Sequence, residues 1–134
     1  VASLFVNRMK RGWRLETDPT IIYGIHKGVP QPSLTITASQ KARQTEYNTY
    51  QIDGLPPTPI ANPGVDALEA VANPAQTDYL FMMAVTPGDY RDGHYFASSH
   101  EEHQQNVVKY RRQEREQAAE PANEQPAPAD TPSQ

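Results

Sequence analysis

The sequence predicts an α+β fold in which several helices surround a small antiparallel sheet. Two apolar stretches, Tyr79–Val85 and His94–Ser98, flank the turn-rich segment Pro87–Gly93, and this order is typical of a β-hairpin. Other parts of the chain carry apolar residues at helical spacing. The 134 residues are close to the usual size of one domain, so we expect a single unit over residues 1–118.

The last residues, 119–134, are predicted to form a disordered tail. They read AEPANEQPAPADTPSQ, which is rich in proline, alanine and glutamate and has no aromatic residue. Three acidic residues lie there without a balancing base, so most of the net charge of −4 belongs to the tail. The body is then nearly neutral, and nucleic acid is not an expected partner.

A first helix is expected at the N-terminus. The polar and basic residues around Arg8 fall mostly on one side of it, and the apolar residues fall on the other (Val1, Leu4, Phe5 and Met9). Gly12 can end this helix just past its last turn.

A second, short helix is predicted over Pro19–Tyr23. Asp18 would be its N-cap and Pro19 its first helical residue, a common arrangement at helix starts, and Gly24 would end it. Free N–H groups at such a start can bind a ligand oxygen, but Asp18 can equally serve only as a cap. The sequence leaves both interpretations open.

The following segment, Ile25–Glu46, is polar with few apolar anchors, and we expect a long, partly irregular excursion. A short helix could form within it at Ala38–Gln44. His26 stands there without a second histidine or a carboxylate at metal-ligand spacing, so no metal site is predicted.

The segment Tyr47–Gly64 (YNTYQIDGLPPTPIANPG) is predicted to be a stiff, extended loop. Its four prolines fix the backbone and exclude a helix interior or a central strand. Tyr47–Tyr50 lead into it with hydroxyl and amide groups, so the segment could form one wall of a polar binding site. The alternative is a structural crossover in which the tyrosines only pack.

Two more helices are predicted beyond this loop. The last one, roughly His100–Gln117, begins with a capping box formed by Ser99 and Glu102. The other spans Gly64–Ala72, capped by Asn62, and its apolar residues are expected to face inward (Val65, Leu68, Val71 and Ala72).

Three histidines, His94, His100 and His103, lie near the hairpin and the start of the last helix. A zinc site is one interpretation, but no carboxylate at matched spacing accompanies them beyond Glu101 and Glu102. We favour hydrogen-bonding or substrate-facing histidines and predict neither a metal nor a cofactor. Cysteine is absent, and no run approaches 18 apolar residues, so no disulfide and no membrane-spanning helix are expected.

Four blocks of the sequence resemble one family: VASLFVNRMKRGWRLETDPTIIYG, YNTYQIDGLPPTPIANPGVDALEAVANPA, YLFMMAV and GHYFASSHEEHQQNV. They are similar to the C-terminal part of the YceG-like endolytic murein transglycosylases, formerly labelled aminodeoxychorismate lyases. The resemblance covers Val1 to about Tyr110. It departs from the family pattern in the segment Ile25–Glu46, including Glu46 itself, so the shape of that flap is not implied.

The resemblance implies a fragment of a lysozyme-like catalytic domain. Such enzymes cleave the β-1,4 bond between N-acetylmuramic acid and N-acetylglucosamine in peptidoglycan and leave a 1,6-anhydro end. One glutamic acid suffices, because the sugar's own 6-hydroxyl is the nucleophile. That glutamate lies upstream of the residues that match Val1, and neither Glu16 nor Glu46 matches it. No catalytic residue is therefore expected within these 134 residues, and we expect the fragment alone to be inactive.

The resemblance also implies a setting for the longer protein. That protein would be anchored in the bacterial inner membrane with this domain in the periplasm, where it would bind glycan strands and could meet cell-wall synthases. The fragment itself would be soluble.

The residues that the resemblance assigns to the sugar-binding cleft come from the TDPT, YNTY and GLPP motifs, with two histidines as weaker candidates. Amides and hydroxyls can pair with sugar hydroxyl and acetamido groups, and tyrosine rings can stack on pyranoses. We expect Asn48, and Tyr47 or Tyr50, to point polar atoms into a cleft shared with Asp18 or Thr20. The full set is Asp18, Thr20, Tyr23, Tyr47, Asn48, Thr49, Tyr50, Pro56, Pro57, His94 and His103.

Two other functions compete with this interpretation. A pyridoxal-phosphate lyase would need a lysine that forms an internal aldimine in a large fold, and the four lysines here all lie in apparently exposed settings. A non-catalytic glycan-binding module would differ only in lacking an acid upstream.

Overall fold

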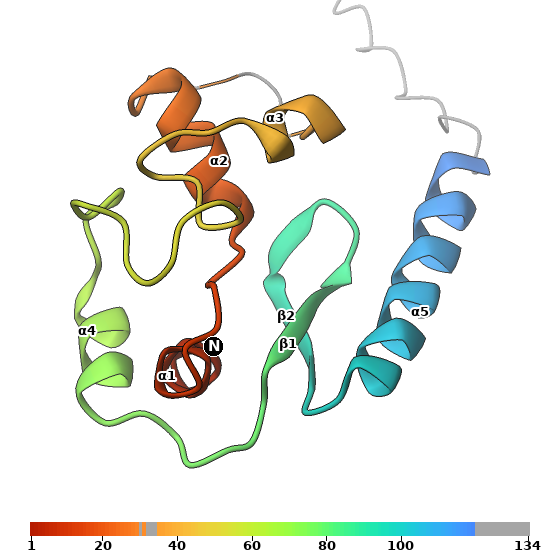
Figure 1. The fold of residues 1–134 in the computed structure, drawn as a ribbon. Helices are drawn as coiled ribbons and strands as arrows, with labels where there is room; N and C mark the ends of the chain where they lie inside the picture. The colour runs from red at the N-terminus through yellow and green to blue at the C-terminus, as the bar shows by residue number, and fades with distance from the viewer. Residues whose placement is uncertain (30, 32–34, 120–134) are drawn as a thin grey trace, which may run out of the picture.

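The structure is a computed structural model that describes residues 1–29, 31 and 35–119. In these residues it contains five helices and one two-stranded sheet, so the predicted α+β class is confirmed (Figure 1). The elements follow in the order α1 (Ala2–Lys10), α2 (Asp18–His26), α3 (Ala38–Ala42), α4 (Val65–Ala72), β1 (Phe81–Thr86), β2 (Asp89–Ala97) and α5 (His100–Ala119).

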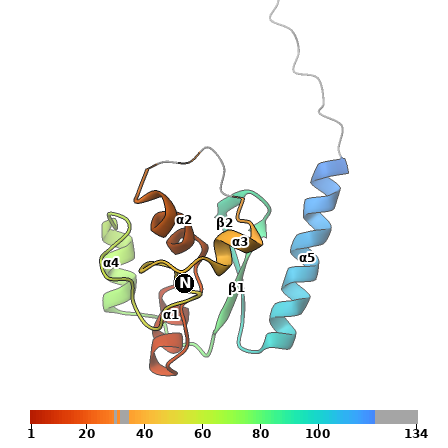
Figure 2. The same cartoon turned by 45° about the horizontal axis from the view of Figure 1, so that its top comes forward.

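The predicted hairpin is present as the antiparallel pair β1–β2. Phe81 pairs with Ala97 and Met83 with Tyr95, so these four residues share one face of the sheet. In both views α5 runs along one side of the hairpin, and the N-terminal helices lie on the other (Figures 1 and 2). The face that includes Tyr95 meets α5, because the ammonium of Lys109 lies 5.3 Å from the centre of the Tyr95 ring.

Helix α1 buries only part of its predicted apolar face. Leu4 is buried as expected, but Arg8 is buried too, with 7% of its surface exposed, whereas Val1 and Met9 are exposed. The prediction that Arg8 faces away from the core is therefore wrong. Its guanidinium can be buried because Nε donates to the Leu80 carbonyl at 2.7 Å, and Nη1 donates to the carbonyls of Arg14 and Leu15 at 3.1 and 3.2 Å.

Helix α2 differs from its prediction at both ends. Thr17, not Asp18, is the N-cap residue, and the helix continues through Gly24 to His26. Gly24 has a packing role instead of a terminating one. A Cβ at Gly24 would come within 2.2 Å of the Thr45 hydroxyl oxygen, so glycine lets the helix approach the following segment closely.

Helix α4 is exposed along its whole length, which contradicts the prediction that its apolar residues face inward. Val65, Leu68 and Val71 each expose more than half of their surface, and no residue of α4 is buried. Its N-cap is Gly64 and not Asn62. The apolar spacing predicted the helix correctly but not the exposure of its apolar residues.

The start of α5 follows the predicted capping chemistry. In α5 the N–H of Glu102 donates to the Ser99 hydroxyl at 3.2 Å, and the Glu102 carboxylate accepts from Ser98 N–H at 3.0 Å. Helix α5 ends at Ala119, the residue at which the disordered tail was predicted to begin, and the rest of that predicted tail, 120–134, lies outside the described residues. None of the helices in the described ranges is both long and apolar enough to cross a bilayer.

We predict that Arg8→Ala lowers the free energy of unfolding by about 3 kcal/mol or more, because three buried carbonyl oxygens lose a charged donor. Urea denaturation measures this loss. Arg112→Ala is the matched control, since Arg112 is 80% exposed in an (i, i+4) pair with Glu116 and should cost only about 0.3–0.5 kcal/mol. Equal losses in the two variants would contradict a structural role for Arg8.

Candidate functional site

Three threonines connect the start of α2 to the YNTY segment. The Thr49 backbone N–H donates to the Thr20 hydroxyl at 3.1 Å, and the two hydroxyl oxygens lie 2.8 Å apart. The Thr17 N–H donates to the Thr49 hydroxyl at 2.9 Å. Thr20 and Thr49 are almost completely buried. The TDPT and YNTY motifs, which are about 30 residues apart in sequence, therefore form one rigid unit.

Asn48 is fully buried and bonded only to backbone. Its side-chain amide donates to the carbonyls of Lys41 and Arg43 at 3.0 and 2.8 Å, and its oxygen accepts from Tyr50 N–H at 3.0 Å. The expectation that Asn48 points polar atoms into a cleft is not met. The side chain instead fixes the path of the chain from α3 to the YNTY segment.

Tyr50 reaches the first turn of α2. Its hydroxyl donates to the Asp18 carboxylate at 2.8 Å. This contact brings the YNTY segment next to the TDPT segment, as expected from the sequence. Burial raises the pKa of Tyr50, and the hydrogen bond to Asp18 raises it further. The phenol therefore stays protonated at neutral pH and acts as a donor. The ammonium of Lys41 lies 4.4 Å from the centre of its ring.

A second tyrosine pair joins α2 to the proline loop. The rings of Tyr23 and Tyr47 lie 4.8 Å apart at 58°, and the Tyr47 hydroxyl is 2.8 Å from that of Thr58. In the loop itself, Pro56 is half-buried and Pro57 is exposed. Tyr47 thus connects α2, through Tyr23, to the proline loop, through Thr58.

Phe81 is the centre of an aromatic cluster that packs against the Arg8 guanidinium. The Arg8 guanidinium carbon lies 5.5 Å from the centre of the Phe81 ring, and the His103 ring stacks on it at 5.1 Å and 19°. His100 and Trp13 both approach Phe81 edge-on at 6.0 Å. His103, one of the weaker site candidates, belongs to this cluster and not to the Asp18–Tyr50 pair.

His103 has an unusual environment. Burial lowers its pKa, and the nearby charges of His100 and Arg8 lower it further. Its Nδ1 atom is buried and has no hydrogen-bond partner among the described residues. The imidazole is therefore neutral at physiological pH.

His94 lies apart from His103. It pairs with Ala84, so it belongs to the sheet face opposite Phe81 and α5. Its ring is 6.2 Å from Phe96, which in turn stacks on Tyr79 at 5.2 Å. In the described ranges no three His, Cys, Asp or Glu side chains are arranged to hold a metal ion.

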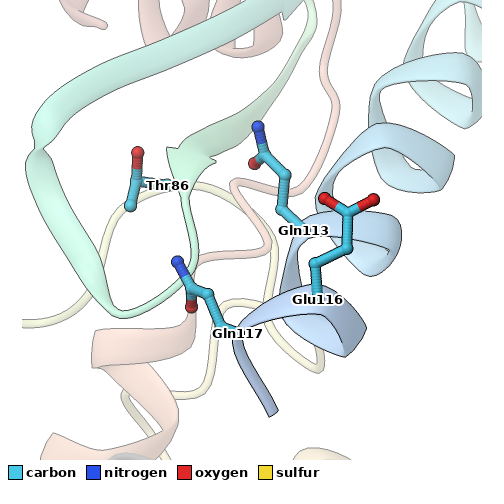
Figure 3. A pocket seen from close by; sticks show the side chains of 4 residues that line it. All are labelled: Thr86, Gln113, Glu116 and Gln117. Atoms are coloured by element: carbon cyan, nitrogen blue, oxygen red, sulfur yellow. The ribbon is translucent and has the colours of Figure 1, made fainter. Parts of the chain in front are cut away.

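The surface hollows do not coincide with these residues. One of about 270 Å³ lies between the hairpin and the last turns of α5, lined by Thr86, Gln113, Glu116 and Gln117 (Figure 3). Another, of about 260 Å³, lies between α2 and α3 beside Ile22 and His26. Neither is lined by a residue assigned to the sugar-binding cleft. We do not place the site in them, since the first has only four polar side chains and no aromatic surface.

A sequence model of the YceG-like family matches residues 1–109. The chain belongs to the YceG-like family. It is 39% identical over 113 residues to an endolytic murein transglycosylase of Bacillus subtilis. The aligned region covers 82% of this chain and 28% of that protein. A protein of the same name from Streptococcus pneumoniae is 31% identical over 112 residues, or 20% of its length.

A solved structure supports the same family. The crystal structure of a YceG-like protein from Listeria monocytogenes matches with a TM-score of 0.68 and 36% identity, over 78% of this chain and 32% of that chain. This YceG-like chain thus spans a third or less of the length of these relatives.

Sequence reasoning missed two contributors to this region. Arg8 was placed on the solvent side of α1, and Thr17 was not considered. A run of basic residues gives no signal that one of them is buried. Thr17 could have been found, because a threonine before Asp-Pro is a plausible N-cap.

We predict that Asn48→Ala lowers the free energy of unfolding by about 3 kcal/mol, because two carbonyls and one N–H lose their buried partner. Glycan affinity per folded molecule should be unchanged. Thermal melting and a binding titration on the same sample measure both. Gln51→Ala, which removes two exposed hydrogen bonds, one to the Lys41 carbonyl and one from the Gln44 amide, should cost less than about 0.5 kcal/mol. Normal stability with lost binding would instead make Asn48 a ligand contact.

We predict a pH effect from His103. Its pKa is lower in the folded state than the ordinary 6.5, so below pH 6.5 the unfolded chain binds more protons, and stability falls as the pH drops through this value. His103→Phe keeps a ring on Phe81 but cannot titrate. The melting temperature of this variant should fall less between pH 7.5 and 5.5 than that of the wild type. His26→Gln is the control, and an identical fall in wild type and His103→Phe would refute the prediction.

Proposed function

We propose that this chain is the glycan-binding part of an endolytic peptidoglycan lytic transglycosylase. The observation that carries the proposal is the connection of the TDPT and YNTY motifs through the Tyr50–Asp18 and Thr20–Thr49 hydrogen bonds. These are the motifs that resemble the family's sugar-binding cleft. The names of the relatives from Bacillus and Streptococcus agree with this substrate.

In this proposal the site residues divide into two groups. Some offer polar atoms or ring faces to the sugars: Asp18, Tyr23, Tyr47, Tyr50, Pro56, Pro57, His94 and His103. The others, Thr20, Asn48 and Thr49, are buried and position the first group. Hydroxyl, carboxylate and aromatic groups are the usual partners of sugar hydroxyls, acetamido groups and pyranose faces.

The complete enzyme would cleave the bond between N-acetylmuramic acid and N-acetylglucosamine and leave a 1,6-anhydro end, thereby ending growth of the strand. A general acid protonates the leaving oxygen and then accepts a proton from the 6-hydroxyl. We propose that this acid is not among these 134 residues, because none of their glutamates matches the family's acid. Anchoring in the inner membrane, a periplasmic location and contact with cell-wall synthases belong to the same proposal for the longer protein.

Purified sacculi test this proposal. We expect the chain to sediment with sacculi but to release no 1,6-anhydro muropeptides, as judged by mass spectrometry. Tyr50→Phe, which removes the hydroxyl on Asp18, should reduce the sedimented fraction several-fold. Gln105→Ala on the exposed side of α5 is the control and should sediment normally. Failure of the wild type to sediment would refute the glycan-binding function. Release of anhydro products would show that an acid lies within residues 1–134.

A further inference from the structure

We infer that Glu16 and Trp13 form a further saccharide subsite, outside the set of residues that the resemblance assigns to the sugar-binding cleft. The carboxylate would accept a hydrogen bond from an acetamido N–H or a hydroxyl, and the indole would stack on a pyranose ring. The inference rests on the proposed function. The inference adds residues 13–16 to the proposed binding site. This segment lies between the Asp18–Tyr50 pair and the aromatic cluster around Phe81.

The backbone of Glu16 is the first observation. Its φ is 50°, and Lys27 is the only other described non-glycine residue with a positive φ. Glycine adopts this conformation without strain, whereas a residue with a Cβ does not. The Glu16 N–H donates to the Thr49 carbonyl at 3.3 Å, so the conformation is held by the buried threonine unit. A carboxylate is thus kept where the backbone alone would favour glycine.

The partners of the Glu16 carboxylate are the second observation. One oxygen lies 3.6 Å from Nη1 of Arg8, and 48% of the side chain is exposed. Arg8 already donates to three backbone carbonyls and does not depend on this ion pair. No hydrogen bond to the carboxylate occurs within the described ranges, so its oxygens are available to a ligand.

Trp13 supplies the aromatic surface. It exposes 42% of its surface, although its ring packs edge-on against Phe81 and its backbone N–H donates to the Arg8 carbonyl at 2.9 Å. The contacts form an unbroken series from Trp13 to Phe81, then to the Arg8 guanidinium and to Glu16. The exposed part of the indole is thus connected to the Glu16 carboxylate through Phe81 and Arg8, and both kinds of group are suited to sugars.

The subsite is also tied to the proposed site. Nη1 of Arg14, in the same segment, donates to the Tyr50 carbonyl at 2.9 Å, and its Nε donates to Asp53 at 2.8 Å. A glycan lying on Tyr50 would therefore have residues 13–16 directly beside it, so the two surfaces can contact successive sugars of one strand.

The competing explanation is that Glu16 only neutralises the buried charge of Arg8. The two explanations differ for Glu16→Gly, which removes the carboxylate and suits a φ of 50°. A subsite predicts weaker glycan binding with an unchanged or higher melting temperature. A neutralising role predicts a lower melting temperature with unchanged affinity per folded molecule.

Trp13 is the only tryptophan of the chain, so its fluorescence reports binding directly. The probes are the β-1,4-linked N-acetylglucosamine tetramer and glycan strands freed of peptide by an amidase, with calorimetry as a second readout. We expect Glu16→Gly to raise the dissociation constant at least tenfold and Glu16→Gln to raise it less, because the amide oxygen still accepts. All titrations are run at a temperature where each variant is folded.

Two matched variants control the experiment. Lys27→Gly relieves the other positive φ and should match Glu16→Gly in its effect on melting temperature. Glu116→Gln removes an exposed carboxylate paired with Arg112 and should leave affinity unchanged. If the wild type binds and Glu16→Gly binds equally well, the subsite is refuted and the proposed function stands. If the wild type binds neither probe, both are refuted.

Discussion

The burial of the Arg8 guanidinium is the interaction on which the rest of the structure depends. Its donors join three parts of the chain: α1 itself, the segment that ends at Leu15, and Leu80, the residue before β1. Each link is a hydrogen bond from a charged donor to a backbone carbonyl, so it fixes the path of the chain and not only the side chains. The hairpin and the segment leading to α2 are thereby set relative to α1.

The apolar core of the described residues is small, and this has a consequence for how the fold is specified. The buried apolar residues in the described ranges are few and include two alanines, and as many polar residues are buried beside them. Arg8, Asn48, Thr20 and Thr49 therefore carry much of the structural specification through directional bonds. Such a network holds one arrangement well, but each missing partner leaves a buried polar group unsatisfied. The TDPT and YNTY motifs are thus important for folding.

The sequence predicted those features that depend on local chemistry. The hairpin followed from apolar runs around a turn, and the capping box of Ser99 and Glu102 followed from spacing alone. Contact between Asp18 and Tyr50 was anticipated from the resemblance of two motifs. What failed was burial. The periodic pattern of α4 could not show that its apolar face is uncovered, and that of α1 could not show that an arginine is buried.

Other failures have a backbone origin. Gly24 looked like a helix end, because glycine commonly ends helices, but it is needed inside α2 where Thr45 approaches. The left-handed conformation of Glu16 is imposed by Thr49, which lies 33 positions further along the chain. No local pattern announces such a conformation in a glutamate, since it results from a tertiary hydrogen bond and not from the propensity of the residue.

Two titratable groups near the motifs are held in their neutral forms. Burial and the hydrogen bond to Asp18 raise the pKa of Tyr50, so its phenol stays protonated, and burial lowers the pKa of His103, so its imidazole stays deprotonated. The two groups lie in different surroundings, because Tyr50 contacts the Asp18 carboxylate at the start of α2 whereas His103 stacks on Phe81. The Tyr50 phenol is therefore a donor to a carboxylate, and this bond joins the YNTY segment to the first turn of α2 in the same way as the buried threonines do.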